Sequence, residues 1–96
     1  MMQEKIFKQK TQNLINQYNK ENYLLVIREA KLLLQKVPNN TFLYNLIGSC
    51  FQNLNDLDNA KVFFEKALTV DDKNISALNN LGNVYKNLKN FEHAEK

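Results

Sequence analysis

The stretch that decides the fold is residues 44–72, YNLIGSCFQNLNDLDNAKVFFEKALTVDD. A short polar joint, Asn55-Asp56, divides it into two halves with helically spaced apolar residues. These apolar residues are Leu43, Ile47, Cys50, Phe51 and Leu54, then Ala60, Phe63, Phe64, Ala67 and Leu68. At 3.6 residues per turn, each set forms a stripe along one face of a helix. The stretch therefore predicts two amphipathic helices that pack antiparallel and leave apolar surface for a neighbour.

The composition around this stretch is that of a small helical globular protein. The chain has 96 residues, of which 44% are hydrophobic and 24% charged, enough for one domain with a modest core. Only two glycines and one proline occur, which favours helices over a turn-rich β fold. The 13 Lys and Arg residues are interleaved with 10 Asp and Glu residues, for a net charge of +3. This pattern indicates a solvated surface and argues against a nucleic-acid-binding protein.

Neither an export signal nor a membrane span is visible in the sequence. The N-terminus lacks the apolar run of a signal peptide, and no segment approaches the roughly 20 apolar residues that cross a bilayer. The single cysteine, Cys50, falls on an apolar stripe and is expected to be buried and unreactive. We therefore expect a cytoplasmic protein with no membrane contact and no intrachain disulfide.

Residues suited to catalysis or metal binding are sparse. The only histidine is His93, and the paired carboxylates Asp56 with Asp58 and Asp71 with Asp72 fall at expected helix boundaries. Helix capping and solvation account for carboxylates in such places. No glycine-rich phosphate loop is present. The sequence thus predicts no catalytic residue, no metal site and no cofactor, and we do not expect a self-contained enzyme.

Four further helices are expected outside the central pair. Their ranges are 3–19, 23–36, 75–87 and a last helix from Phe91 with Asn90 as its cap. Pro38 ends the helix before it, and Asn39 to Thr41 supply the turn and cap of the helix over 41–53. The first helix is half polar, as expected for the outer end of a stack of helices.

The helix pair recurs along the chain. The shift that superposes Asn45 on Asn79 also places Gly48 on Gly82, Asn53 on Asn87, Leu54 on Leu88 and Ala60 on Ala94. The same shift aligns three helix joints, which begin at residues 22, 56 and 90. A helical hairpin that recurs at such a period, about 34 residues, is typical of a solenoid repeat.

The recurring pattern resembles a known family. Residues 44–67 read Y-x-x-I-G-x-x-F, then A-x-x-x-F-x-x-A, which closely resembles the tetratricopeptide repeat pattern W-x-x-L-G-x-x-Y, A, F, A. Residues 78–85 repeat its first half, and the copy reaches Ala94. Small residues are needed where paired helices approach closely, and Gly48, Gly82 and Ala60 occupy such positions.

The resemblance implies an all-α fold, a right-handed α-α superhelix of about two and a half repeats within one domain over residues 1–96. The copies cover about 7–40, 41–74 and a truncated 75–96. The first copy diverges, with Leu14 in place of the glycine and Gln17 in place of the aromatic. A one-residue slip that pairs Tyr18 with Phe51 also fits, so two registers of the first helix stay open.

Members of this family typically bind extended peptides or partner helices in a concave groove. Carried over by position, the peptide-binding groove comprises Phe42, Asn45, Ser49, Gln52, Asn53, Ser76, Asn79, Asn80, Asn83, Lys86 and Asn87. Asparagine amides both donate to and accept from a peptide backbone. The expected groove is therefore rich in amides, nearly neutral and tolerant of ligand sequence.

One family subset binds acidic chaperone tails through a clamp of Lys, Asn and Arg. The corresponding positions here are Thr11, Ile15, Leu46, Ser76 and Asn80. None of these side chains is a cation that could meet a carboxylate. We therefore predict no binding of chaperone tails.

The unfinished third copy bears on function. A complete copy would run to about residue 104, so part of its first helix lacks a partner. This predicts either the N-terminal fragment of a longer protein or self-association through the truncated repeat. Two functions follow: a non-catalytic protein-protein interaction scaffold, or the substrate-recruiting arm of a larger enzyme such as a glycosyltransferase or sulfotransferase. RNA binding is a third, weaker reading, which predicts affinity that falls steeply with salt.

Overall fold

The computed structural model describes the backbone of residues 4–94 and the side chains of residues 4–89. Its helices are α1 (Glu4–Asn19), α2 (Tyr23–Leu34), α3 (Thr41–Asn53), α4 (Leu57–Val70) and α5 (Ile75–Ala94). Residues 4–94 contain no strand. The all-α prediction is confirmed, and the first four helices lie where the sequence places them.

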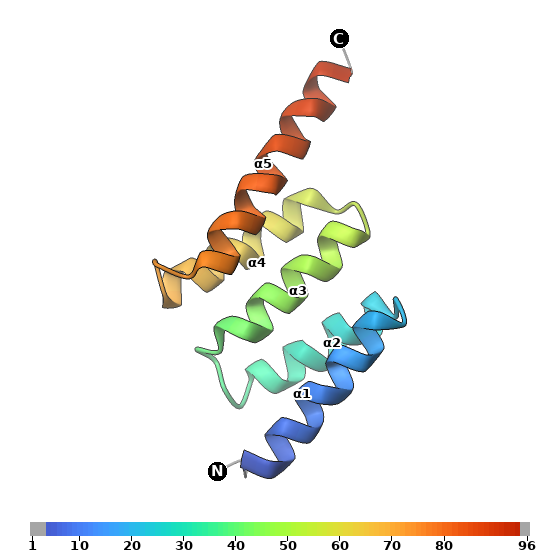
Figure 1. Cartoon of the computed structure of the whole chain (residues 1–96), viewed down its shortest axis with the longest axis vertical. Coiled ribbons are helices and arrows are strands. Elements are labelled where there is room, and N and C mark those ends of the chain that lie inside the picture. The colour runs from blue at the N-terminus through green and yellow to red at the C-terminus, as the bar shows by residue number, and fades with distance from the viewer. Residues whose placement is uncertain (1–3, 95–96) are drawn as a thin grey trace.

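The helices are arranged as a two-layered stack. Each helix packs on the next one along the chain, and α3 also touches α5. In Figure 1, α1, α3 and α5 lie in the nearer layer, while α2 and α4 lie behind them. The stack extends 51 × 29 × 18 Å, longest in the direction in which hairpins are added. This is the helical-repeat solenoid that the repeat period predicts.

The period is also visible in the backbone of the hairpin turns. Glu21 and Asn55, which the repeat places at equivalent positions, have φ values of 64° and 63°. Each is followed by a residue whose N–H closes the preceding helix, Asn22 to the Gln17 carbonyl at 3.0 Å and Asp56 to the Phe51 carbonyl at 2.9 Å. These bonds form the C-terminal helix motif that a left-handed residue makes possible. The turn of the first hairpin therefore matches that of the second in both position and geometry.

Asparagine caps repeat in the same way at the starts of α3 and α5. The Asn40 Oδ1 accepts from the Leu43 N–H at 2.9 Å, and the Asn74 Oδ1 accepts from the Ala77 N–H at 2.9 Å. Each bond satisfies a backbone donor that the first helical turn leaves free. The predicted cap of α3 is confirmed.

Two buried clusters join the helices. One lies among α1, α2 and α3 and consists of Leu14, Val26, Ile27, Ala30, Leu33, Leu43, Leu46, Ile47 and Cys50. The other lies between α4 and α5 and consists of Leu57, Ala60, Phe64, Leu81 and Val84. Cys50 is fully buried, as predicted, and burial raises the pKa of its thiol to about 12. Leu54 was expected in the apolar stripe, but it follows the last turn of α3 and is 41% exposed.

The predicted break near Asn90 is wrong. The backbone stays helical from Ile75 to Ala94 in one element, without a turn like that at Asn55. Residues 86–94 include no glycine or proline that would end a helix. Continuing the intrahelical hydrogen bonds is then more favourable than breaking them. The side chains of Asn90, His93 and Ala94 lie outside the described part.

The two aligned glycines have different surroundings. A Cβ on Gly48 would lie 2.6–2.9 Å from three ring atoms of Phe64 in α4, so the predicted close helix approach is confirmed there. A Cβ on Gly82 would meet no atom within 4 Å, so the same prediction is wrong for α5. Phe64 belongs to α4, and no atom of the described residues takes the corresponding place over Gly82.

Candidate functional site: a hollow in the inner layer

A hollow of about 430 Å³ opens between α1, α3 and α5. Its lining residues are Tyr18, Thr41, Phe42, Asn45, Leu46, Ser49, Asn74, Ser76 and Asn80. The volume falls within the range typical of ligand sites in proteins, about 300–1,000 Å³. The helices α1, α3 and α5, the nearer layer in Figure 1, form the inner layer of the stack. The hollow is the part of the predicted groove that these three helices surround.

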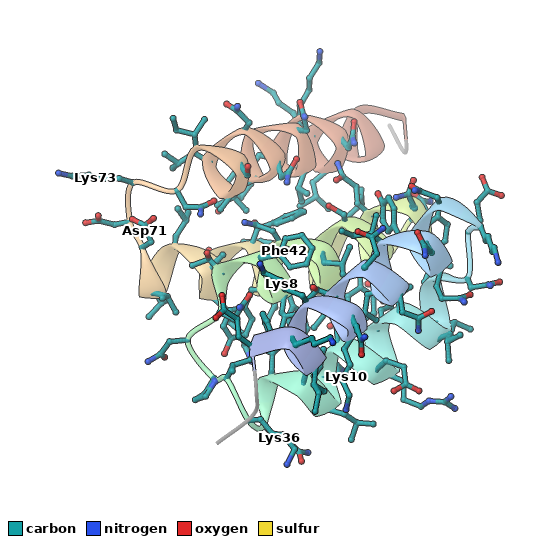
Figure 2. The ribbon with its side chains drawn as sticks, turned by 60° about the horizontal axis from the view of Figure 1, so that its bottom comes forward. Lys8, Lys10, Lys36, Phe42, Asp71 and Lys73 are labelled. Carbon is teal, nitrogen blue, oxygen red and sulfur yellow. The ribbon has the colours of Figure 1, made fainter. Side chains whose placement is uncertain are left out.

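Five of the predicted groove residues meet in this hollow. They are Phe42, Asn45 and Ser49 from α3, with Ser76 and Asn80 from α5. Figure 2 shows the labelled Phe42 between α1 and α5, and its side chain is 42% exposed. The site therefore combines the rings of Phe42 and Tyr18 and the apolar Leu46 with polar side chains.

The other predicted groove residues do not line the hollow. Gln52 is half-buried in α3, whereas the side chains of the remaining ones are exposed. These exposed residues are Asn53, Asn79, Asn83, Lys86 and Asn87. The predicted groove thus has one part that lines the hollow and one part that lies outside it.

Sequence reasoning missed four lining residues. Tyr18 comes from α1, whose register the sequence left open, and Asn74 was assigned to the turn and not to the site. Thr41 begins α3 and was assigned to its cap, and Leu46 was assigned only to a position of the chaperone-tail clamp. The match of Asn74 to the cap residue Asn40, one repeat earlier, is the signal that could have identified it.

The amide of Asn45 connects one repeat to the next. Its Nδ2 donates to the Asn74 Oδ1 at 3.1 Å, and that same oxygen caps α5. The Asn45 Oδ1 is buried and accepts no hydrogen bond from the described atoms. Buried amide oxygens are nearly always paired in folded proteins. The Asn45 Oδ1 is therefore an exception among the buried polar atoms of the described part.

Asn53 also makes structural contacts. Its Nδ2 donates to the Tyr18 hydroxyl and to the Ser49 carbonyl, each at 2.9 Å. The Tyr18 ring in turn packs edge-on against Tyr23, with 5.4 Å between centroids. These contacts fix Tyr18 at the α1 side of the hollow, so Asn53 positions a lining residue from outside it.

The lining of the hollow carries no charged side chain. Three of the positions that correspond to the chaperone-tail clamp, Leu46, Ser76 and Asn80, lie in it. Another of these positions, Thr11, donates its hydroxyl to the Lys8 carbonyl at 3.0 Å. The site therefore offers amides, hydroxyls and aromatic rings, and the absence of chaperone-tail binding stays a prediction.

Neither a metal-binding cluster nor a membrane span is found in the described part of the chain. No three His, Cys, Asp or Glu side chains among these residues come together in a way that could hold an ion. No helix in this part is long and apolar enough to cross a bilayer. The Cys50 thiol, at 0% exposure, is separated from the surface.

The fold defines a class, the helical-repeat proteins built from stacked helical hairpins. Two sequence models of the tetratricopeptide repeat match, one at residues 43–74 and one at residues 63–96. Together they cover more than half of the sequence. The chain belongs to the tetratricopeptide repeat family, as the resemblance implied.

Two curated proteins of red algae are similar in sequence, and both are described as uncharacterized protein ycf37. The protein of Porphyra purpurea is 37% identical over 76 residues, which cover 79% of this chain and 40% of that protein. The protein of Pyropia yezoensis is 36% identical over 53 residues, with 55% and 30% covered. The chain therefore spans less than half the length of these relatives.

A solved structure is similar in fold. The first tetratricopeptide repeat domain of human RPAP3, determined by NMR, superposes with a TM-score of 0.79 at 20% identity. The match covers 88% of this chain and 66% of that chain. At this identity the likeness shows the fold alone. Tetratricopeptide repeats are in general non-catalytic modules that bind proteins or peptides, so family membership indicates a protein-protein interaction scaffold.

Proposed function

We propose that this chain is a scaffold without catalytic activity that binds an extended peptide in the hollow between α1, α3 and α5. The observation that carries the proposal is the uncharged lining, in which amides and hydroxyls surround the exposed ring of Phe42. Pockets of this size with a few convergent polar groups are the usual place for ligand binding.

The chemistry of the lining suits a peptide backbone. Asn80 and Ser76 each offer both a donor and an acceptor, and Asn45 retains an unpaired oxygen. Because no cation or carboxylate lines the hollow, selection among ligands depends on shape and on apolar contact with Phe42 and Tyr18.

A peptide selected from a random phage-displayed library on the folded chain is the probe for this proposal. Its affinity is measured by calorimetry for the wild type and for Asn80→Ala. Loss of one net hydrogen bond predicts about a two- to tenfold weaker Kd. The matched control is Asn13→Ala, an exposed α1 residue outside the hollow, which is expected to leave the Kd unchanged.

The part of the predicted groove that lies outside the hollow is tested separately. The double variant Asn79→Ala with Asn83→Ala removes two exposed amides on α5. We expect weaker peptide binding and a nearly unchanged Tm, since neither side chain is buried. If Asn80→Ala and this double variant both bind the selected peptide as the wild type does, the inner layer is not the binding site.

A further inference from the structure

A row of aromatic rings lies where the first and second hairpins meet. The Phe51 and Phe63 rings are stacked with 5.7 Å between their centroids, and the Tyr44 ring is tilted against Phe63 at 6.4 Å. All three rings are half-buried. Two of them come from α3 and the third from α4, which together with α2 forms the other layer of the stack (Figure 1). Part of each ring is therefore accessible in the middle of the chain, between consecutive repeats.

Two lysines from different helices lie over this row. The Lys31 Nζ, on α2, is 5.8 Å from the centroid of the Phe51 ring and 5.5 Å from that of Phe63. The Lys66 Nζ, on α4, is 5.0 Å from the Phe63 centroid. An ammonium group within about 6 Å of a ring centroid is attracted to the ring. We call Lys31, Phe51, Phe63 and Lys66 the lysine-aromatic patch.

The positive charge of the patch is not compensated by the neighbouring carboxylates. Neither lysine forms an ion pair among the described side chains, where the ion pair found joins Arg28 to Glu29. Glu29 precedes Lys31 by two residues, and Glu65 follows Phe63 by two residues. Residues two apart in a helix do not face each other. An anion that approaches the patch is therefore attracted by both ammonium groups without competition from these carboxylates.

The chemistry of the patch favours an acidic peptide over a nucleic acid. The rings are stacked on one another and lie beside the ammonium groups, which leaves little ring face on which a base could stack. Nucleic-acid binding also depends on many phosphate contacts, whereas the patch offers two cations. Two copies of the chain that met through this patch would bring like charges together, which is unfavourable. Carboxylates on either side of an apolar residue match both the lysines and the half-buried rings.

We propose that the lysine-aromatic patch binds an acidic segment of a partner protein, whose carboxylates meet Lys31 and Lys66 while an apolar side chain lies on the rings. The rings hold the two ammonium groups in place before binding, so less side-chain freedom is lost when the segment binds. The patch shares no residue with the hollow between α1, α3 and α5. Either proposal can fail without the other.

A blocked synthetic peptide with a central leucine between two pairs of glutamates is the probe. It is titrated into the isotope-labelled chain while amide chemical shifts are recorded by NMR. We expect shifts at Lys31, Phe63 and Lys66, and none at Ser76 or Asn80 in the hollow. The matched control peptide has glutamines in place of the glutamates and is expected to give much smaller shifts. Binding of the acidic peptide is expected to weaken as the salt concentration rises.

A pair of double variants tests the two lysines. Lys31→Gln with Lys66→Gln is expected to weaken the Kd of the acidic peptide about three- to tenfold, as the loss of two exposed ion pairs predicts. The matched control, Lys20→Gln with Lys73→Gln, changes the net charge equally at two exposed turn residues outside the patch. It is expected to leave the Kd nearly unchanged. All four lysines are exposed, so both variants should keep the helical circular dichroism of the wild type.

Three results would overturn the proposal. The first is equal binding of the acidic peptide and its glutamine control. The second is an equal change of Kd in the two double variants, which would mean that net charge alone attracts the peptide. The third is a single-stranded RNA oligonucleotide that shifts the same residues at lower concentration than the peptide does, since a nucleic acid would then be the occupant of the patch.

Discussion

The helices α3 and α5 begin with the same chemistry and end in different surroundings. Each starts at an asparagine cap, and each carries a glycine seven residues into the helix, Gly48 in α3 and Gly82 in α5. The positions Leu43, Ile47 and Cys50 of α3 are buried, and so are the matching positions of α5. The buried side of both helices is thus built alike, whereas only α3 has a helix packed over its glycine.

This difference shows how a repeat motif relates to packing. A glycine between large residues allows another helix to pack closely, but the motif alone does not show that a helix packs there. In α3 the glycine is a packing residue because the Phe64 ring occupies the space above it. In α5 the same residue type lies on an exposed helix, where glycine costs backbone entropy and gains no contact.

Removal of the Phe64 ring is expected to have the largest effect on stability, because this ring packs over the glycine of α3. Phe64→Ala removes a fully buried side chain that contacts Gly48 and belongs to the cluster between α4 and α5. We expect a loss of about 3–5 kcal/mol in the free energy of unfolding, as for other buried aromatic residues. Urea denaturation followed by circular dichroism measures this free energy. A variant that no longer unfolds cooperatively would also agree with the expected loss.

The matched control for that change is Tyr85→Ala in α5, at the position that matches Phe51 of α3. The ring is 47% exposed and is contacted by the Lys61 ammonium. An exposed cation-π contact predicts a loss of less than about 1 kcal/mol. Equal losses in the two variants would mean that the aromatic residues of the two helices are equivalent, contrary to the comparison.

Gly48→Leu is the next largest change. The nearest atoms to the new Cβ belong to the Phe64 ring, which is enclosed on all sides and has little room to move. Overpacking of this kind predicts a destabilisation of about 1–3 kcal/mol. A thermal melt that matches the wild type would show that α3 and α4 do not approach closely at this point.

The asparagine caps allow α3 and α5 to be compared at their first turns. Asn40→Ala removes one cap bond of α3, and a loss of about 1 kcal/mol is expected. Asn74→Ala removes the cap of α5 and also the acceptor of the Asn45 amide, so its loss should be larger by several tenths of a kcal/mol. Urea midpoints of the two variants measure the difference. Equal midpoints would show that the Asn45 bond contributes nothing to stability.

Local patterns in the sequence were sufficient to predict most of the fold. The helices α1 to α4, the cap at Asn40 and the burial of Cys50 each follow from residues close to one another in the chain. The repeat period then predicted which helices would be neighbours. Short-range signals of this kind are reliable where the apolar pattern is strongly periodic.

Features that depend on a distant partner could not be read in the same way. The uninterrupted α5 and the empty space at Gly82 both result from which helix is present to pack there. For the site, the resemblance to the family placed Phe42 and Asn80 in the expected groove, but it did not show that Asn45 is bonded to Asn74 or that Tyr18 lines the hollow. Those contacts join different repeats, and no pattern within one repeat encodes them.

Gly82→Ala gives the smallest effect and the sharpest distinction between the two helices. Since no atom lies within 4 Å of the new Cβ, only helix propensity changes, and a gain of up to about 1 kcal/mol is expected. Gly48→Ala gains the same propensity but places its Cβ 2.6 Å from the Phe64 ring, so a net loss is expected. The two variants differ by a single methyl group from the same parent, and their urea midpoints should move in opposite directions. A shift of the same sign in both would mean that the two glycines have equivalent surroundings.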